Sequence, residues 1–401
     1  MDKKPKRMVP EVRFKGFTDD WEQRKLGEVA KIIGGGTPNT KNPEYWNGKI
    51  NWYTPAEIGN NIYATSSERK ITEEGLKHSS AKVLPIETIL FTSRAGIGKT
   101  AILTESAATN QGFQSIVPNR QIIDSYFLYS LSNSLRKYGE THGAGSTFVE
   151  ISGRELAKAN IKLPKLWEQK LVSKLVKSID KLLSLQQRKL KQLKQVRKAM
   201  LRQLLGPKKD KSIPNIRFKN FTEAWEQRKL GEVATFINGR AYKQRELLDS
   251  GKYKVLRVGN FYTNDSWYYS NLELADKYYI DKGDLVYTWS ATFGPHIWNG
   301  EKVIYHYHIW KIVLSKFLDR DFTLQILKAD KAKLLVNTNG STMIHVTKKD
   351  MESKIISLPN IEEQKRIGSY LIKFDSLIAL QQRKTDKLSN LKKFCLQKIF
   401  I

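Results

Sequence analysis

The stretch FKGFTDDWEQRKLGEVA at residues 14–30 occurs again as FKNFTEAWEQRKLGEVA at residues 218–234. When the comparison is extended five residues back, 16 of 22 aligned positions are identical. A second pair of related phrases follows, LPKLWEQK from Leu163 and LPNIEEQK from Leu358. A repeat of this length indicates that one structural module occurs twice in the chain.

The composition of the chain is strongly basic. Among 401 residues, 69 are Lys or Arg and 40 are Asp or Glu, which gives a formal net charge of +29. Such an excess favours nucleic acid or an anionic membrane as partner. No apolar run approaches the ~20 residues of a membrane-spanning helix, and no apolar stretch follows the basic start. The single cysteine, Cys395, is typical of a reducing cytosol. We expect a cytoplasmic protein that binds nucleic acid.

Each LP phrase leads into a long stretch with heptad spacing. Apolar residues recur at positions a and d over about five heptads, which predicts a coiled coil. A basic residue occupies the same d position in both stretches, Arg197 and Lys392. The alternative is an ordinary amphipathic helix that packs on its own globule. The predicted seam consists of Val172, Ile179, Gln186, Leu193, Ile367, Phe374, Gln381 and Leu388.

The order of elements predicts an α+β fold with two mixed α/β globules and two long helices. Because the order is globule, helix, globule, helix, a pseudo-two-fold arrangement requires the helices to run antiparallel. Gly206 and Pro207 are expected to end the first helix. The predicted boundaries are residues 1–165 for the first globule, 166–206 for the first helix, 207–212 for a linker, 213–358 for the second globule and 359–401 for the second helix.

Three fragments that resemble catalytic or ligand-binding motifs are incomplete. Residues 96–100, GIGKT, resemble the end of a GxxxxGK[ST] phosphate loop, but Ser93 stands where its first glycine is required. Residues 42–45, NPEY, differ at the third position from the Asn-Pro-Pro-aromatic tetrapeptide of amino-methyltransferases. His306 and His308 share a strand face, but no spaced third metal ligand is evident, so hydrogen bonding to DNA, or simply a polar strand face, is favoured over zinc. We expect no catalytic set and no metal in this chain.

These residues together resemble the specificity subunit of type I restriction-modification systems. The resemblance covers nearly the whole chain and lies in a duplicated order: WEQRKLGEVA, then Gly-Ser-Thr (residues 145–147 and 340–342), then the LP and EQK phrases and the long helix. It implies that each globule is a target-recognition domain for one half of a bipartite, asymmetric site in double-stranded DNA. It also implies an antiparallel helix pair that sets the gap and docks two methyltransferase subunits.

The resemblance further implies two restriction/translocase subunits in the complete enzyme. S-adenosylmethionine, ATP and magnesium are then expected in the partners and not in this chain, which would itself be non-catalytic. Two alternatives stay open. A catalytic methyltransferase or nuclease would bind S-adenosylmethionine or cleave DNA without partners, and a non-specific nucleic-acid scaffold would bind all sequences equally at matched salt.

The two globules differ strongly between their shared phrases, so base-contacting residues are not carried over from the family. When the two halves are aligned at an offset of 196, two segments of the first half correspond to different residues in the second. These are the turn after residue 93 and the segment NQGFQ at 110–114. Asn and Gln suit adenine edges and Arg suits guanine. The candidate DNA-binding residues are Arg94, Lys99, Asn110, Gln111 and Gln114 in the first globule, and Arg240, Tyr242, Arg257, His306, His308 and Lys311 in the second.

Overall fold

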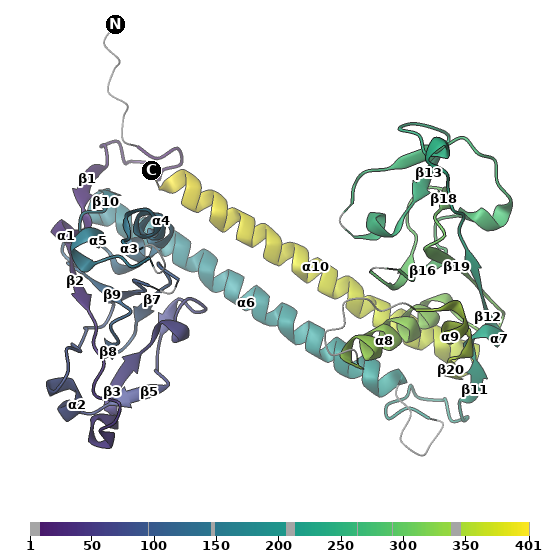
Figure 1. Cartoon of the computed structure of the whole chain (residues 1–401), viewed down its shortest axis with the longest axis horizontal. Helices are drawn as coiled ribbons and strands as arrows, with labels where there is room; N and C mark the ends of the chain where they lie inside the picture. The colour runs from purple at the N-terminus through teal and green to yellow at the C-terminus, as the bar shows by residue number, and fades with distance from the viewer. Residues whose placement is uncertain are drawn as a thin grey trace, which may run out of the picture. The chain divides into compact units, whose positions relative to one another are not determined.

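The computed structural model describes residues 9–94, 96–145, 149–205, 213–262, 264–290, 292–337 and 346–400. The predicted linker at 207–212 and the serine and threonine of both Gly-Ser-Thr phrases lie outside these residues. The chain divides into two compact units. Unit 1 comprises Met1–Gln187 and Lys384–Ile401, and unit 2 comprises Arg188–Arg383. Each unit holds a sheet-rich globule and portions of two long helices, so the predicted α+β class is confirmed (Figure 1).

The globule of unit 1 is built on a five-stranded sheet of order β2-β9-β6-β7-β4 and a three-stranded sheet of order β5-β3-β8. Strand β6 is buried throughout, because its residues ILF lie at the centre of the larger sheet. The elements are β1 (Glu22–Lys25), α1 (Leu26–Val29), β2 (Ala30–Gly34), β3 (Trp46–Tyr53), β4 (Tyr63–Ala64), β5 (Arg69–Ile71), α2 (Glu73–Lys77), β6 (Ile89–Phe91), β7 (Thr100–Leu103), β8 (Ala107–Thr109), β9 (Gln114–Pro118), α3 (Ser125–Ser130), α4 (Ser132–His142), α5 (Gly153–Leu156) and β10 (Asn160–Leu163).

The globule of unit 2 has two four-stranded sheets, of order β12-β19-β16-β17 and β14-β13-β18-β15. The elements are β11 (Glu226–Lys229), α7 (Leu230–Val233), β12 (Ala234–Asn238), β13 (Tyr253–Leu256), β14 (Tyr268–Ser270), β15 (Tyr279–Ile280), β16 (Leu285–Thr288), β17 (Gly294–Ile297), β18 (Val303–Tyr305), β19 (Ile309–Leu314), α8 (Arg320–Asn337), α9 (Lys348–Ser353) and β20 (Ile355–Leu358). In both units the repeated phrase EQRK forms a strand that pairs antiparallel with the strand of the LP phrase, β1 with β10 and β11 with β20.

A buried ion pair ties the start of each repeat to its long helix. In unit 1 the guanidinium of Arg13 donates two hydrogen bonds to Glu168, at 2.7 and 2.8 Å. In unit 2 Arg217 binds Glu363 with the same two distances. The two glutamates are 1% and 0% exposed. Because a buried carboxylate is costly without a partner, each arginine is required to complete its unit.

The glutamine of the EQK phrase has a structural role in both units. Gln169 donates to the Pro164 carbonyl at 2.9 Å and accepts from the Asp124 amide at 2.9 Å. Gln364 makes the equivalent bonds. It donates to the Pro359 carbonyl and accepts from the amide of Asp319, the residue before α8, each at 2.9 Å. These side chains satisfy backbone groups that would otherwise be buried without partners, which explains why the phrase recurs.

The long helices α6 (Leu166–Leu205) and α10 (Ile361–Ile399) run antiparallel in each unit. In unit 1 the Asp180 carboxylate pairs with Lys392 at 2.6 Å, while residues nearer the start of α6 pack with the end of α10. In unit 2 Arg197 pairs with Asp375 at 3.0 Å. The predicted a and d residues of both helices are buried or partly buried. A basic d residue and an acid of the opposite helix thus make the same contact in both units.

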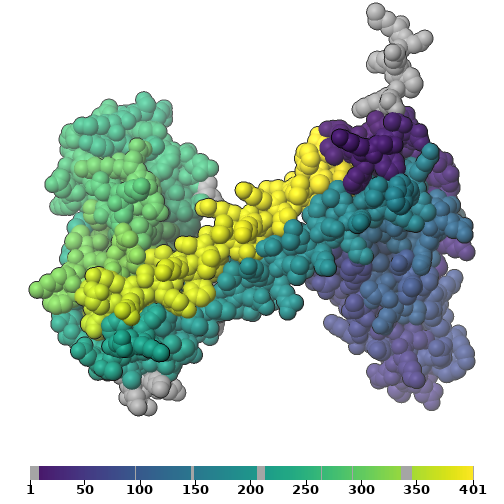
Figure 2. All heavy atoms as spheres, turned by 180° about the vertical axis from the view of Figure 1, so that it is seen from behind, coloured from purple at the N-terminus to yellow at the C-terminus, as the bar shows by residue number. Residues whose placement is uncertain are grey.

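The end of α10 completes the core of unit 1. Ile399 belongs to the same buried cluster as Trp21 and Phe127, and Phe400 packs against that cluster. The Val12 amide donates to the Lys398 carbonyl at 3.0 Å, so the last turn of α10 (yellow) lies against the segment before β1 (dark purple in Figure 2). Across the described ranges, the structure has no helix long and apolar enough to cross a membrane.

Candidate nucleic-acid interface

A tight turn follows the buried strand β6 in unit 1 and its counterpart β16 in unit 2. In unit 1 the Thr92 hydroxyl donates to the Gly96 carbonyl at 2.7 Å and accepts from the Lys99 amide at 2.9 Å. In unit 2 the Thr288 hydroxyl donates to the Thr292 carbonyl at 2.9 Å. In both units a threonine at the end of the strand closes the turn by a hydrogen bond across it. The two turns therefore share a local backbone framework although their residues differ.

A glycine after β2 in unit 1, and one after β12 in unit 2, lets the following loop lie against the segment that precedes the next turn of the globule. A Cβ added to Gly35 would lie 2.0 Å from the Asn110 carbonyl oxygen, and one added to Gly239 would lie 2.5 Å from that of His306. Neither approach leaves room for a side chain. The next residue of each loop donates its amide to the neighbouring segment, at 2.8 Å in unit 1 and 3.0 Å in unit 2. Three segments therefore converge at one edge of each globule.

Arg94, Asn110 and Gln111 of the predicted set lie together at this edge of unit 1. A 2.8 Å backbone hydrogen bond from the residue before Arg94 to Gly112 joins the two turns that carry them. The side chain of Asn110 accepts from the Gly112 amide at 2.9 Å, and that of Gln111 accepts from Thr37 at 2.5 Å. Gln111 is exposed and the other two are partly buried. The edge thus carries amide and guanidinium groups that match adenine and guanine edges.

The other two predicted residues of unit 1 have different surroundings. Gln114 is paired opposite Gly34 at the end of β2, so it lies next to the edge but is partly buried. Lys99 lines a separate cavity of about 230 Å³ together with Arg136 and Lys392. Asp180, which also lines the cavity, pairs with Lys392, and Arg136 pairs with Glu140. A lysine in a polar cavity suits contact with a phosphate better than with a base edge.

Three residues predicted in unit 2 are held by contacts inside the globule. Arg240 binds Glu246 through two hydrogen bonds of 2.8 and 3.0 Å. Lys311 pairs with Asp284 at 2.7 Å. Burial raises the pKa of the Tyr242 hydroxyl, which packs beside a small buried cluster. A role for these three groups in DNA binding stays a prediction.

Arg257, His306 and His308 lie close to one another in unit 2. The two imidazole centroids are 4.9 Å apart, and the Arg257 guanidinium lies 4.1 Å from the centre of the Tyr268 ring. The pKa of His306 is lowered to about 4, mainly by burial and to a smaller extent by the charges of His308 and Arg257. His306 is therefore neutral near pH 7 and carries both a donor and an acceptor nitrogen.

Aromatic side chains that were not among the predicted candidates lie beside these histidines, and Trp289 is one of them, partly exposed. Trp289 donates its indole N–H to the Tyr307 carbonyl at 2.9 Å, and its ring lies 4.9 Å from that of His308. Tyr307 contacts both imidazoles and is 37% exposed. Tyr262 is 39% exposed and lies beside another histidine, His296, with 5.4 Å between ring centroids. Exposed rings of this kind stack on bases. One available signal was that Trp289 occupies the position that Ser93 has in the first half.

The histidines of unit 2 do not form a metal site within the described structure. No three His, Cys, Asp or Glu side chains come together there in a way that could hold an ion. His306 and His308 are instead placed among aromatic rings.

Comparison with known proteins identifies the family. A family model described as the type I restriction modification DNA specificity domain matches residues 18–195 and 222–390. The MjaIX specificity subunit of Methanocaldococcus jannaschii is 31% identical over 60% of this chain, and the match spans only 57% of that relative. The MjaVIII specificity subunit of the same organism is 24% identical over 94% of this chain and 91% of its own length.

The fold also has a solved counterpart. A type I restriction-modification S subunit from M. genitalium superimposes with a TM-score of 0.63 at 13% identity, over 98% of this chain and 99% of that one. At this identity the likeness concerns the fold alone. The family model, by contrast, matches most of both halves, including the repeated phrases and most of the two long helices. The chain belongs to the type I restriction-modification DNA specificity family.

Proposed function

We propose that this chain is the DNA-reading subunit of a type I restriction-modification complex, and that each globule reads one half of a bipartite, asymmetric site. The observation that carries this proposal is the pair of equivalent edges. The same threonine-fastened turn and the same close glycine approach occur in both globules, whereas the side chains at the edge differ. A constant framework with variable contacts is what recognition of two unlike half-sites requires.

The proposal extends to the assembly of the complex. The antiparallel helices would dock two methyltransferase subunits, and two restriction/translocase subunits would complete the enzyme in the cytoplasm. S-adenosylmethionine, ATP and magnesium would be bound by those partners, while this chain supplies specificity without catalysing a reaction. The domains that read DNA would correspond to residues 1–165 and 213–358.

The experiment is to express the chain with its methyltransferase partner in a host without adenine methylation and to sequence the methylated genome. We expect one bipartite motif with a fixed gap, absent when this chain is omitted. The purified chain alone should neither methylate nor cleave DNA. Methylation or cleavage by the isolated chain, or methylation without a motif, would contradict the proposal.

A segment exchange tests the separate reading of the two half-sites. Replacing residues 31–142 by the corresponding segment of a related subunit should change one half of the motif and leave the other unchanged. The anchors that hold the globule, including Arg13 and Glu168, lie outside the exchanged segment. A change in both halves would show that the globules read cooperatively.

Helix length tests how the gap is set. Adding one heptad to both helices lengthens them by about 10 Å at 1.5 Å per residue, equal to roughly three base pairs at 3.4 Å each, and keeps the seam in phase. The half-site sequences should stay fixed while the gap lengthens. An unchanged gap in an active variant would leave the helices as a docking surface only.

A further inference from the structure

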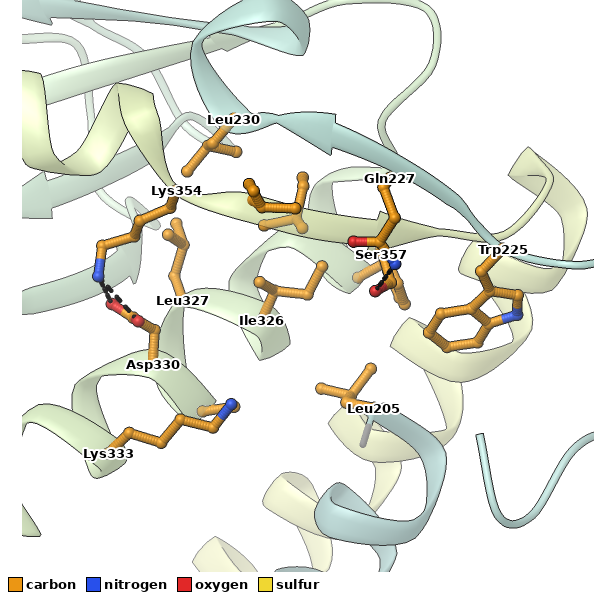
Figure 3. Close-up of a pocket in the computed structure, with 14 residues that line it drawn as sticks. Leu205, Trp225, Gln227, Leu230, Ile326, Leu327, Asp330, Lys333, Lys354 and Ser357 are labelled. Atoms are coloured by element: carbon orange, nitrogen blue, oxygen red, sulfur yellow. Dashed lines mark hydrogen bonds and ion pairs between the residues drawn. The ribbon is translucent and has the colours of Figure 1, made fainter. Parts of the chain in front are cut away.

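A cavity of about 390 Å³ lies in unit 2, between the end of α6, helix α8 and strand β20 (Figure 3). Its walls include Leu205, Trp225, Phe322 and Ile326. Trp225 is 4% exposed and Phe322 is fully buried, so these walls belong to the core of the unit. The volume lies within the range of small-ligand and side-chain pockets.

The equivalent place in unit 1 is filled by two aromatic rings. Phe400, which stands 195 positions after Leu205, lies 5.1 Å from Phe127 and 6.3 Å from Trp21 between ring centroids. Tyr138, which corresponds to Lys333 at the same offset of 195, packs against the same core cluster. Unit 2 has Leu205 and Lys333 at these two positions. The cavity therefore exists where the repeated scaffold has lost two rings.

Two further positions beside the cavity are apolar in unit 1 and charged in unit 2. Leu135 and Ala159 of unit 1 are 2% and 1% exposed. Their counterparts in unit 2 are Asp330 and Lys354, which form an ion pair of 2.7 Å. Lys333 extends from α8 toward the cavity (Figure 3), and no side chain in the described part of the chain pairs with it. The rim thus has one positive charge without a counter-charge.

One apolar side chain that lines the cavity is exposed to solvent. Ile355, which lines the cavity, is 69% exposed, whereas unit 1 has the polar Asn160 at the same position of its strand. A single exposed apolar side chain is ordinary on a protein surface, but Ile355 also lines the cavity, so an occupant of the cavity lies next to it. A small molecule inside the cavity would leave most of this side chain in water, but a protein segment that enters the cavity would cover it.

We propose that this cavity receives an aromatic side chain of a partner protein, with an adjacent carboxylate of that partner on Lys333. The partner supplies in unit 2 the ring that unit 1 supplies for itself with Phe400. The two halves of this duplicated chain are then unequal in docking, because Phe400 already packs on Phe127 and Trp21 at the equivalent place of unit 1. The inference goes beyond the reading of DNA, since the cavity is formed away from the turns after β16 and β18.

The first test uses 3-phenylpropionate as probe, because it joins a phenyl ring to a carboxylate. Ligand-observed NMR with the full chain should give saturable binding with a Kd in the millimolar range, as expected for so small a ligand. The double variant Leu205→Phe with Lys333→Tyr restores the unit 1 residues and should abolish this binding. The neutral 3-phenylpropionamide should bind roughly threefold more weakly. Equal binding to the filled variant, or no saturable binding, would overturn the proposal.

A second probe separates a protein segment from a small molecule. The peptide acetyl-Asp-Phe-Asp-amide should compete with 3-phenylpropionate and bind at least several-fold more tightly, because it also covers Ile355. A peptide that binds no better would exclude a protein occupant. If the filled variant fails to fold, Lys333→Gln should still weaken the peptide roughly threefold. DNA affinity should be unchanged in these variants, so that failure here is distinct from failure of the proposed DNA function.

Discussion

The proposed recognition edges of the two globules share a framework and differ in chemistry. In unit 1 the turns after β6 and β8 carry Arg94, Asn110 and Gln111, which are hydrogen-bonding groups. In unit 2 the equivalent turns carry Trp289 and Tyr307, with histidines between them. Amides and guanidinium distinguish bases by donor and acceptor patterns, whereas rings act by stacking and apolar contact. A duplicated scaffold can therefore support two different modes of readout without a change of fold.

The buried ion pairs of Arg13 and Arg217 should contribute equally to the stability of the two units. Arg13→Ala and Arg217→Ala each leave a buried glutamate without its partner, and each should lower the free energy of unfolding by about 3–5 kcal/mol. Chemical denaturation followed by circular dichroism measures the loss. Arg228→Ala removes a solvent-accessible pair with Glu226 and should cost far less stability than either buried pair. A loss in only one unit would show that the two frameworks are not equivalent.

The part that should differ is the response of the edges to conservative changes. Asn110→Ala and Tyr307→Ala should each weaken specific binding about ten- to hundredfold, the effect of one lost base contact of ~1–3 kcal/mol. Tyr307→Phe should retain most affinity because its ring still stacks. Asn110→Asp should not, because it removes the amide donor. Binding is measured against DNA with one half-site altered at a time.

If both edges respond to these changes in the same way, the contrast between hydrogen bonding and stacking is wrong. If Tyr307→Ala instead alters the half-site read by the first globule, the assignment of one half-site to each globule is wrong as well.

Acid should loosen the helix pair of unit 2 through Asp375. Burial alone would raise its pKa, but the hydrogen bond and charge of Lys328 and the charge of Arg197 outweigh burial, so its pKa is lowered. A lowered pKa in the folded state adds stability above the unfolded value near 4, and this stability is lost as pH falls through the folded value. Asp375→Asn should reduce the loss between pH 5 and pH 3 by on the order of 1 kcal/mol.

Thermal unfolding across this pH range measures that difference. Glu226→Gln on the exposed surface serves as the control and should follow the wild-type curve. Parallel curves for Asp375→Asn and wild type would mean that the ion network of Asp375, Lys328 and Arg197 does not stabilise the folded state.

The smallest expected effect concerns the cavity lined by Lys99. If Lys99 contacts a phosphate, Lys99→Gln should weaken binding to all DNA sequences by about the same few-fold factor. The slope of log affinity against log salt should fall by about one. A change of preferred base in this variant would place Lys99 with Asn110 among the base-reading groups.

The sequence predicted the framework because the framework is repeated. The phrase EQRK pairs with the LP strand, and the EQK glutamines bind backbone at the start of both helices. The sequence places a basic residue at the same d position of both helices, Arg197 and Lys392, and both form ion pairs with the opposite helix. Matched positions in two copies gave a signal that single positions do not give.

The chemistry of the edges was harder to predict. Lys311 is paired with Asp284, which becomes its neighbour only when β16 and β19 come together. Arg240 is paired with Glu246, six positions away, where the extended chain between them gives no helical spacing to indicate the contact. Trp289 was missed because it directly follows the β-rich run at 285–288, where aromatic residues such as Tyr287 belong to the core. Which side chain faces outward is set by the turn geometry, and the sequence of the turn does not reveal it.

The packing of Ile399 and Phe400 on Trp21 and Phe127 has a consequence for synthesis. Unit 2 is one continuous segment of the chain. Unit 1 also includes Lys384–Ile401, which is synthesised about 200 residues after the rest of the unit. At ~5–20 residues per second, a ribosome takes roughly 10–40 s to supply them. During this interval the face that receives the ring of Phe400 stays open to water or to a chaperone. The globule that is made first is therefore the last to be completed.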